Sequence, residues 1–290
     1  MQHHDKDFFL GLAVWAYSGF YGRLYPNSAS RKDALSLYCN RFLAVENNSS
    51  FYAFPSAETL RKWYEITPAQ FKFVLKLPQD ISHQGLLADN ISRAEAFISF
   101  TREILGEKCG PFMLQLPPRY TPQFGPDLSV FLNAWKRQNL GPISVEFRHP
   151  GWFSEAFYDR SSTLLRRLGM SRTILDTRAI YDQDDDPQAK IQNKKPQLPV
   201  NMAFTNDTIL VRYISHPEQS RNEKYWMEWS KQIGLWLDEG RRVYFFMHCP
   251  QESFSPENAR AFHRCLKSFR PSIPELPWNN LPPDPQLSLF

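Results

Sequence analysis

The sequence predicts an α/β protein that folds as a single (β/α)8 TIM-type barrel with an extended C-terminal tail. Short apolar runs alternate with amphipathic stretches along the whole chain, which is the pattern of strands and helices in a parallel sheet. The length of 290 residues also suits one barrel of roughly 250 residues and a tail. A doubly wound open sheet is the alternative, but no Gly-x-Gly-x-x-Gly motif follows any expected strand.

Eight runs rich in Val, Ile, Leu or Phe are expected to be strands that are buried on both faces. In chain order they are residues 8–15, 43–49, 72–77, 111–116, 143–149, 171–177, 208–214 and 242–249. Helices are expected where apolar side chains recur at helical spacing, within residues 97–105, 128–135, 226–237 and 262–269. Ser255-Pro256-Glu257 predicts the start of the last of these helices, because proline and an acid favour the first helical turn.

Two segments interrupt this alternation. Residues 178–206 form a long loop after the sixth expected strand, with three successive aspartates and several lysines, and it is either a lid over the barrel or a solvated insertion. Residues 271–290 are rich in proline and lack periodicity. We therefore divide the chain into a barrel, residues 1–270, and a flexible tail, residues 271–290.

Composition sets broad limits on the class of protein. The net charge of +4 suits a polyanionic partner as well as a small phosphorylated substrate. The four cysteines have no C-x-x-C spacing, so they are expected to be reduced thiols of a cytoplasmic protein. No run reaches the roughly 18 apolar residues of a membrane helix, and the first residues do not resemble a signal peptide.

Polar side chains gather where the expected strands end. Side chains two residues apart on a strand share a face, so Glu46 goes with Asn48, and Glu146 with Arg148. Five other strands each contribute one residue at or near their carboxyl ends, namely Lys76, Gln115, Asp176, Arg212 and His248. Functional groups of barrel enzymes collect at this end. The sequence therefore predicts an active site there, and a self-neutralising ion network is the alternative.

The residue types suggest a division of roles within this site. Basic and amide groups hold a phosphate or another substrate group, for which we select Asn48, Lys76, Gln115, Arg148 and Arg212. Acids and histidines transfer protons, for which we select Glu46, Glu146, His83, Asp176 and His248. A divalent metal is a further option, with His149 and His216 as extra ligands. However, no H-E-x-x-H spacing occurs and nearby cations would repel a metal.

Seven ordered motifs between residues 8 and 269 resemble the YecE-like family, also known as domain of unknown function seventy-two. They are Gly11-x-x-x-Trp15-x-Tyr17, Tyr25-Pro26, Val45-Glu46-x-Asn48-x-x-Phe51-Tyr52, Phe71-x-Phe73-x-x-Lys76, Ile81-Ser82-His83, Leu114-Gln115-Leu116-Pro117-Pro118 and Val145-Glu146-Phe147-Arg148-His149. The resemblance implies a barrel fold and brings no settled activity. Asn47 and Ser49-Ser50 depart from the residues usual in the family, but no candidate site residue is lost.

The last five residues, Gln286-Leu287-Ser288-Leu289-Phe290, resemble the bacterial sliding-clamp-binding pentapeptide. An extended peptide of this kind places its leucines and phenylalanine in apolar pockets, and a proline-rich linker keeps it accessible. A frayed apolar terminus, or one that docks on its own barrel, is the alternative.

Three functions remain open at this point. The first is a clamp-tethered enzyme, such as a hydrolase, or a factor that acts on DNA or nucleotides in replication or repair. The second is a metabolic isomerase or hydrolase of a phosphorylated or sugar-like small molecule. The third is a non-catalytic protein that binds the clamp.

Overall fold

A computed structural model of the chain describes residues 5–182 and 195–281. Its strands are β1 (Phe8–Leu12), β2 (Ala44–Asn47), β3 (Lys72–Leu75), β4 (Phe112–Gln115), β5 (Ile143–Glu146), β6 (Ser171–Arg172), β7 (Ile174–Asp176), β8 (Thr208–Ile214) and β9 (Arg242–His248). Its α-helices are α1 (Ala34–Cys39), α2 (Ser49–Tyr52), α3 (Ala57–Ile66), α4 (Gln79–Ser82), α5 (Ile91–Leu105), α6 (Gly125–Arg137), α7 (Glu155–Leu168), α8 (Arg178–Tyr181), α10 (Glu223–Asp238) and α11 (Ser255–Phe269).

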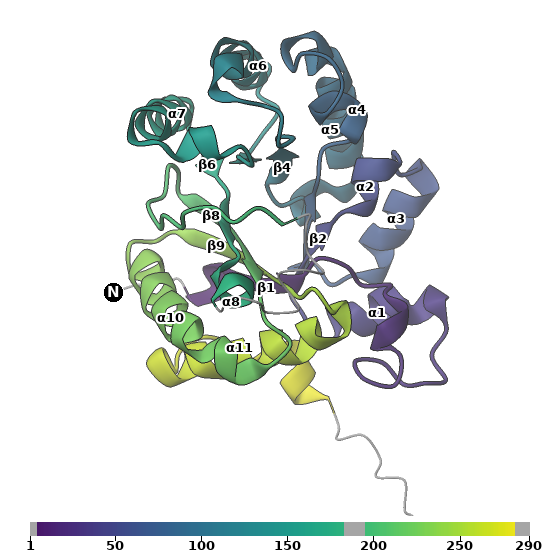
Figure 1. Ribbon diagram of the computed structural model, residues 1–290. Coiled ribbons are helices and arrows are strands. Elements are labelled where there is room, and N and C mark those ends of the chain that lie inside the picture. Colours follow the sequence, from purple (N-terminus) through teal and green to yellow (C-terminus); the bar gives the residue numbers. More distant parts are fainter. Residues whose placement is uncertain (1–4, 183–194, 282–290) are drawn as a thin grey trace, which may run out of the picture.

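The strands form two parallel sheets. Six strands lie in the order β3-β2-β1-β9-β8-β7, and three lie in the order β4-β5-β6. Two single parallel bridges, Phe73 to Cys109 and Lys76 to Met113, join the edge at β3 to the edge at β4. Helices lie around the strands, with α10 and α11 on the opposite side of them from α5 and α6 (Figure 1). The result is a mixed α/β fold with parallel strands, consistent with a TIM-like barrel.

Every expected strand is present, so this part of the prediction is confirmed. The sixth is divided: β6 pairs with β5, whereas β7 pairs with β8, and Thr173 lies between the two halves. The helices expected from periodicity are confirmed as α5, α6, α10 and α11, and α11 begins at Ser255, followed by Pro256, as the start signal predicts.

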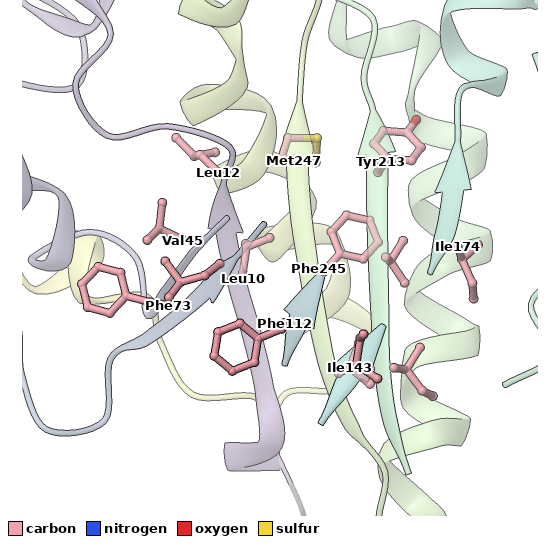
Figure 2. Close-up of a cluster of buried hydrophobic side chains, with 14 of the residues drawn as sticks. Leu10, Leu12, Val45, Phe73, Phe112, Ile143, Ile174, Tyr213, Phe245 and Met247 are labelled. Carbon is pink, nitrogen blue, oxygen red and sulfur yellow. The ribbon is translucent and has the colours of Figure 1, made fainter. Parts of the chain in front are cut away.

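Alternate residues of the strands enter two separate apolar clusters. One cluster packs against the helices, and ten of its strand residues are labelled in Figure 2, among them Leu10, Phe73, Ile174 and Phe245. The other consists of the residues between them on the opposite face, Phe9, Ala44, Val74, Met113, Leu210, Tyr244 and Phe246. Along this second face the side chains change from apolar to charged toward the carboxyl ends of the strands. The charged positions are the candidate site.

Gly11 on β1 lies where two neighbouring strands leave no room for a side chain. A Cβ atom there would collide with the carbonyl oxygen of Ala44 on β2 and would lie 3.1 Å from the ring of Phe246 on β9. We expect Gly11→Ala to lower the free energy of unfolding by roughly 1–3 kcal/mol through overpacking. Chemical denaturation measures this loss. Gly234→Ala is the control, because a Cβ atom at Gly234 on α10 would meet nothing within 4 Å.

The packed part of the chain extends beyond residue 270, after which the sequence predicts a flexible tail. Ile273 and Leu276 are buried in the main cluster, 1% and 2% exposed. The ring of Trp278 packs against Phe42, with the ring centroids 5.8 Å apart, and Arg260 lies over it. The prolines therefore do not prevent packing, because apolar side chains between them bury enough surface to fix residues 271–281. Residues 282–290, including the clamp-like peptide, lie outside the described residues.

The long loop after the sixth expected strand is described at both ends. The loop begins with α8, and its second described part starts at residue 195. There the Tyr181 hydroxyl donates a 2.6 Å hydrogen bond to the carbonyl oxygen of Lys195. The Thr177 hydroxyl donates to the carbonyl oxygen of Pro196. Residues 183–194 lie outside the described residues, so the idea of a lid remains a prediction.

Candidate functional site

Arg212 on β8 joins two glutamates from other strands. Its Nε and Nη2 donate to the two carboxylate oxygens of Glu46 on β2, at 2.7 and 2.8 Å, and its Nη1 donates to Glu146 Oε2 on β5 at 2.6 Å. Both glutamate side chains are fully buried and that of Arg212 is 3% exposed. Three of the charges expected from sequence therefore meet in one buried ion cluster.

Further side chains complete the bonding of the two glutamates. Arg148 Nε donates to Glu146 Oε1 at 2.6 Å, and Asn48 Nδ2 donates to Glu46 Oε1 at 2.8 Å. His248 Nε2 lies 3.2 Å from Glu46 Oε2. Both pairs that the two-residue spacing predicts, Glu46 with Asn48 and Glu146 with Arg148, are thus in contact.

The arginines keep both glutamates ionised. Burial alone would raise the pKa of each carboxyl group, but Arg212 and His248, through their charges and hydrogen bonds together, hold the pKa of Glu46 well below its usual range. Arg212 and Arg148 together lower the pKa of Glu146 to about 2. Conversely, burial lowers the pKa of His248 to about 4. At neutral pH the cluster holds two carboxylates, two guanidinium groups and a neutral imidazole.

Lys76 reaches the cluster from the end of β3. Its Nζ lies 3.7 Å from the centre of the Phe51 ring, and the residue is 7% exposed. Burial, strengthened by the charge of Arg212, lowers the pKa of Lys76 to about 7. The His83 ring packs edge-on against the same Phe51 ring, with centroids 4.9 Å apart. His83 therefore lies beside Lys76, at the rim of the site.

Two site residues are missing from the sequence prediction. Lys195 interacts electrostatically with Arg212 and with both glutamates, and burial lowers its pKa to about 8. Glu252, in the turn after β9, interacts with Lys195, and burial raises its pKa to about 8, so it is protonated at neutral pH. The only sequence signal for Lys195 is a group of neighbouring lysines, and nothing distinguishes it from Lys190 or Lys194 without the anchoring of the loop.

Asp176 does not join the cluster. It lies in register with Tyr213, one residue beyond the pairing of Leu175 with Arg212, and therefore on the face that packs against the helices. Its carboxylate accepts hydrogen bonds from Trp229 Nε1 on α10 at 2.8 Å and from the Arg178 guanidinium. Asp176 therefore does not lie at the catalytic position that the sequence predicts. It links α10 and α8 to the sheet instead.

The remaining predicted residues differ in how close they lie to the ion cluster. Gln115 is buried at the end of β4, in register with Glu146. His149 and His216 accept hydrogen bonds through Nδ1 from the backbone of the turns that follow them, which stabilises these turns. Within residues 5–182 and 195–281, no three His, Cys, Asp or Glu side chains are grouped so that they could hold a metal ion.

A pocket of about 250 Å³ lies beside the cluster, at the ends of β1 and β2. Ala13, Trp15 and Tyr52 contribute to its mostly apolar wall, and Asn48 forms part of its lining. Because the Asn48 amide donates to Glu46, the pocket borders directly on the charged residues. The site thus combines an apolar recess with fixed charges, as small-molecule sites do.

The pKa of His248 predicts that protonation of this residue weakens the fold. The pKa of His248 falls from 6.5 to about 4 on folding, so the unfolded chain binds its proton first as pH decreases. We expect His248 to lower the free energy of unfolding between pH 6.5 and 4 and Glu146 to lower it from pH 4.5 toward 2, whereas Glu252, whose pKa is raised to about 8 on folding, acts in the opposite direction above pH 4.5. Urea denaturation at stepped pH measures this slope. His248→Gln keeps a donor toward Glu46 and should flatten the upper part of the curve; an unchanged slope would contradict the assignment.

The fold and the site define a mixed α/β protein, consistent with a TIM-like barrel, with a charged, buried cluster at the carboxyl ends of its parallel strands. Residues 9–281 match the model of the family described as "Protein of unknown function DUF72". The chain belongs to this family, which confirms the resemblance seen in its motifs.

Relatives match over most of their lengths. "UPF0759 protein YecE" of Escherichia coli (strain K12) is 30% identical over 274 residues, which cover 92% of this chain and 94% of YecE. "UPF0759 protein YunF" of Bacillus subtilis (strain 168) is 27% identical over 228 residues, which cover 76% of this chain and 72% of YunF.

Solved structures support the fold. Crystal structures of DUF72 family proteins from Thermotoga maritima MSB8 and Enterococcus faecalis V583 each match with a TM-score of 0.67 and 18% identity. The matches cover 90% of this chain and 99% and 95% of those chains, respectively. None of the described helices is long and apolar enough to cross a membrane.

Proposed function

We propose that this protein is an enzyme that acts on a small anionic molecule bound at the carboxyl ends of the strands. The excess of basic groups over carboxylates in the cluster carries the proposal. The two carboxylates of the cluster, Glu46 and Glu146, are paired with two arginines. The two lysines, Lys76 and Lys195, have no carboxylate of their own in the cluster. Buried positive charge is unfavourable without a counter-ion, so a phosphate or carboxylate of the ligand would complete the site.

The burial of the cluster favours a small molecule over a nucleic acid. The side chains of Arg212 and Arg148 are 3% and 11% exposed, which is too little for either to meet the phosphates of a duplex. The adjoining pocket of about 250 Å³ suits a compact metabolite. Lys76, with a pKa of about 7, is suited to accept and return a proton near neutral pH, as an isomerase or hydrolase requires.

Binding of inorganic phosphate tests this proposal in its simplest form. We expect phosphate to raise the melting temperature of the protein, and more so than chloride at equal ionic strength. Arg148→Gln should reduce the shift, because it removes a cation while Arg212 still holds Glu146. Arg166→Gln, on the exposed face of α7, is the matched control for loss of charge. Equal shifts in all three proteins would contradict an anion site here.

We further propose, from the sequence alone, that the C-terminal peptide tethers the protein to a bacterial sliding clamp. Its five residues match the clamp-binding pattern, and a tether raises the local concentration of an attached domain near DNA. The test compares the full chain with a version truncated after Pro285 in binding to purified clamp. Micromolar binding that is lost on truncation supports the tether, and equal or absent binding in both versions removes it.

Clamp binding without anion binding would favour a non-catalytic, clamp-associated protein. If the clamp binds and phosphate does too, damaged and branched DNA and free nucleotides become the substrates to test.

We also propose that the two sheets are parts of one closed eight-stranded barrel. The bridges between β3 and β4 support this, as does Thr173, whose N–H donates to the carbonyl oxygen of Val145 between β6 and β7. In this arrangement β6 and β7 are the two halves of the sixth strand.

A further inference from the structure

Lys76 is held in place by its backbone. Its N–H donates to the carbonyl oxygen of Asn47 on β2, and its own carbonyl oxygen accepts a 2.7 Å hydrogen bond from Ser50 Oγ. The N–H and the carbonyl group of Lys76 are thus both bonded to neighbouring elements. These hydrogen bonds hold the base of the side chain, and the Phe51 ring contacts its far end at 3.7 Å, so both ends of the side chain have fixed partners.

The amine has no carboxylate partner. All four oxygens of Glu46 and Glu146 already accept hydrogen bonds from Arg212, Arg148, Asn48 or His248. Within the described part of the chain, no acidic side chain forms a salt bridge with Lys76. A buried lysine with arginines nearby and no counter-ion favours its neutral form, which is the reactive form of an amine.

We propose that Lys76 is a nucleophile that forms an imine with the carbonyl carbon of a small anionic aldehyde or ketone. The inference rests on the proposed anion site and specifies its substrate class. Arg148 would hold the anionic group: its Nε is bound to Glu146, and its terminal nitrogens have no hydrogen-bond partner among the described residues. The charge of Lys195 adds to this attraction.

The chemistry requires no oxidant, reductant or metal. The lone pair of Lys76 Nζ attacks the carbonyl carbon, and the carbonyl oxygen takes up a proton to give a carbinolamine. Loss of that oxygen as water, with the two protons that the amine gives up, forms the C=N bond. Protonation of the imine nitrogen by solvent then gives the iminium ion, which withdraws electrons from the adjacent carbon. An isomerase or a carbon–carbon lyase uses this property.

Reductive trapping tests the inference on the full chain. The protein is incubated separately with pyruvate and with dihydroxyacetone phosphate in the presence of sodium cyanoborohydride, and the modified residues are mapped by peptide mass spectrometry. We expect a single adduct at Lys76, formed on the order of a hundredfold faster than at a surface lysine, since a pKa near 7 leaves about half of the amine neutral at pH 7. The rate should fall as pH decreases below about 7.

Two variants accompany the experiment. Lys76→Arg keeps the positive charge and the packing on Phe51 but cannot form an imine, so it should give no adduct and still be stabilised by phosphate. Lys62→Arg, at an exposed position of α3, should behave as the unmodified protein does. Adducts spread evenly over surface lysines, or an unchanged pattern in Lys76→Arg, would overturn the inference.

Phosphate binding separates this inference from the proposed function. If phosphate stabilises the protein and neither carbonyl compound modifies Lys76, the imine is ruled out and the anion site stands. If phosphate does not bind either, both fail.

Discussion

Replacing Arg212 by methionine is expected to lower the free energy of unfolding by about 3–5 kcal/mol. The substitution keeps much of the side-chain volume, so the loss comes from charge and not from a cavity. Glu46 would remain buried without the guanidinium group that now donates to both of its oxygens at 2.7 and 2.8 Å, and Glu146 would keep only the guanidinium group of Arg148. Urea denaturation measures the loss, and Arg166→Met, on the exposed face of α7, is the control for an arginine that lies outside any such cluster.

Two further measurements identify the cause of this loss. Adding Glu46→Gln to Arg212→Met removes the carboxylate that has lost its guanidinium partner and should restore part of the stability, whereas Glu146 keeps its pair with Arg148. In Arg212→Met alone, the buried carboxyl groups would have raised pKa values, so lowering the pH from 7 to about 5 should stabilise the variant relative to the original protein. A loss below about 1 kcal/mol would show that the ion cluster contributes no more than a surface pair.

Replacing Asp176 by alanine is expected to cost about 3 kcal/mol of stability and to leave anion binding unchanged. The buried carboxylate accepts hydrogen bonds from the Trp229 indole and from the backbone and side chain of Arg178. Its removal leaves a buried indole N–H without a partner and weakens the contact of α10 with the sheet.

The matched control is Glu228→Ala. Glu228 pairs with the same guanidinium at 2.9 Å but is 45% exposed, so its loss should cost less than about 1 kcal/mol. Denaturation and the phosphate-dependent melting temperature are measured for both variants. If Asp176→Ala abolishes the phosphate effect at nearly full stability, Asp176 belongs to the site, as the sequence alone predicts.

Runs of apolar residues predict the strands, because parallel strands that are covered on both faces are almost wholly apolar. Polar residues are rare in such runs and are therefore easy to identify. The two-residue spacing then pairs Glu46 with Asn48 and Glu146 with Arg148 correctly. Asp176 shows the limit of this reasoning. Whether a residue faces the cluster depends on register between strands, and a shift of one residue places a side chain on the other face.

Residues outside the strands were harder to predict for a different reason. Lys195 reaches the cluster because Tyr181 and Thr177 hold its segment, and these contacts join residues far apart in the sequence. The packing of residues 271–281 likewise depends on Trp278 meeting Phe42, which no local pattern encodes. Proline content alone indicated an extended tail, but an extended segment with apolar side chains at suitable positions can still pack.

The contact between Trp278 and Phe42 also places the last described residues relative to the strands. Phe42 lies just before β2, at the amino end of the strands, whereas the ion cluster lies at their carboxyl end. Trp278, near the end of the described residues, and the ion cluster therefore lie at opposite ends of the strands. An anion bound at the cluster, as proposed above, would therefore not occupy the end of the strands against which Trp278 packs.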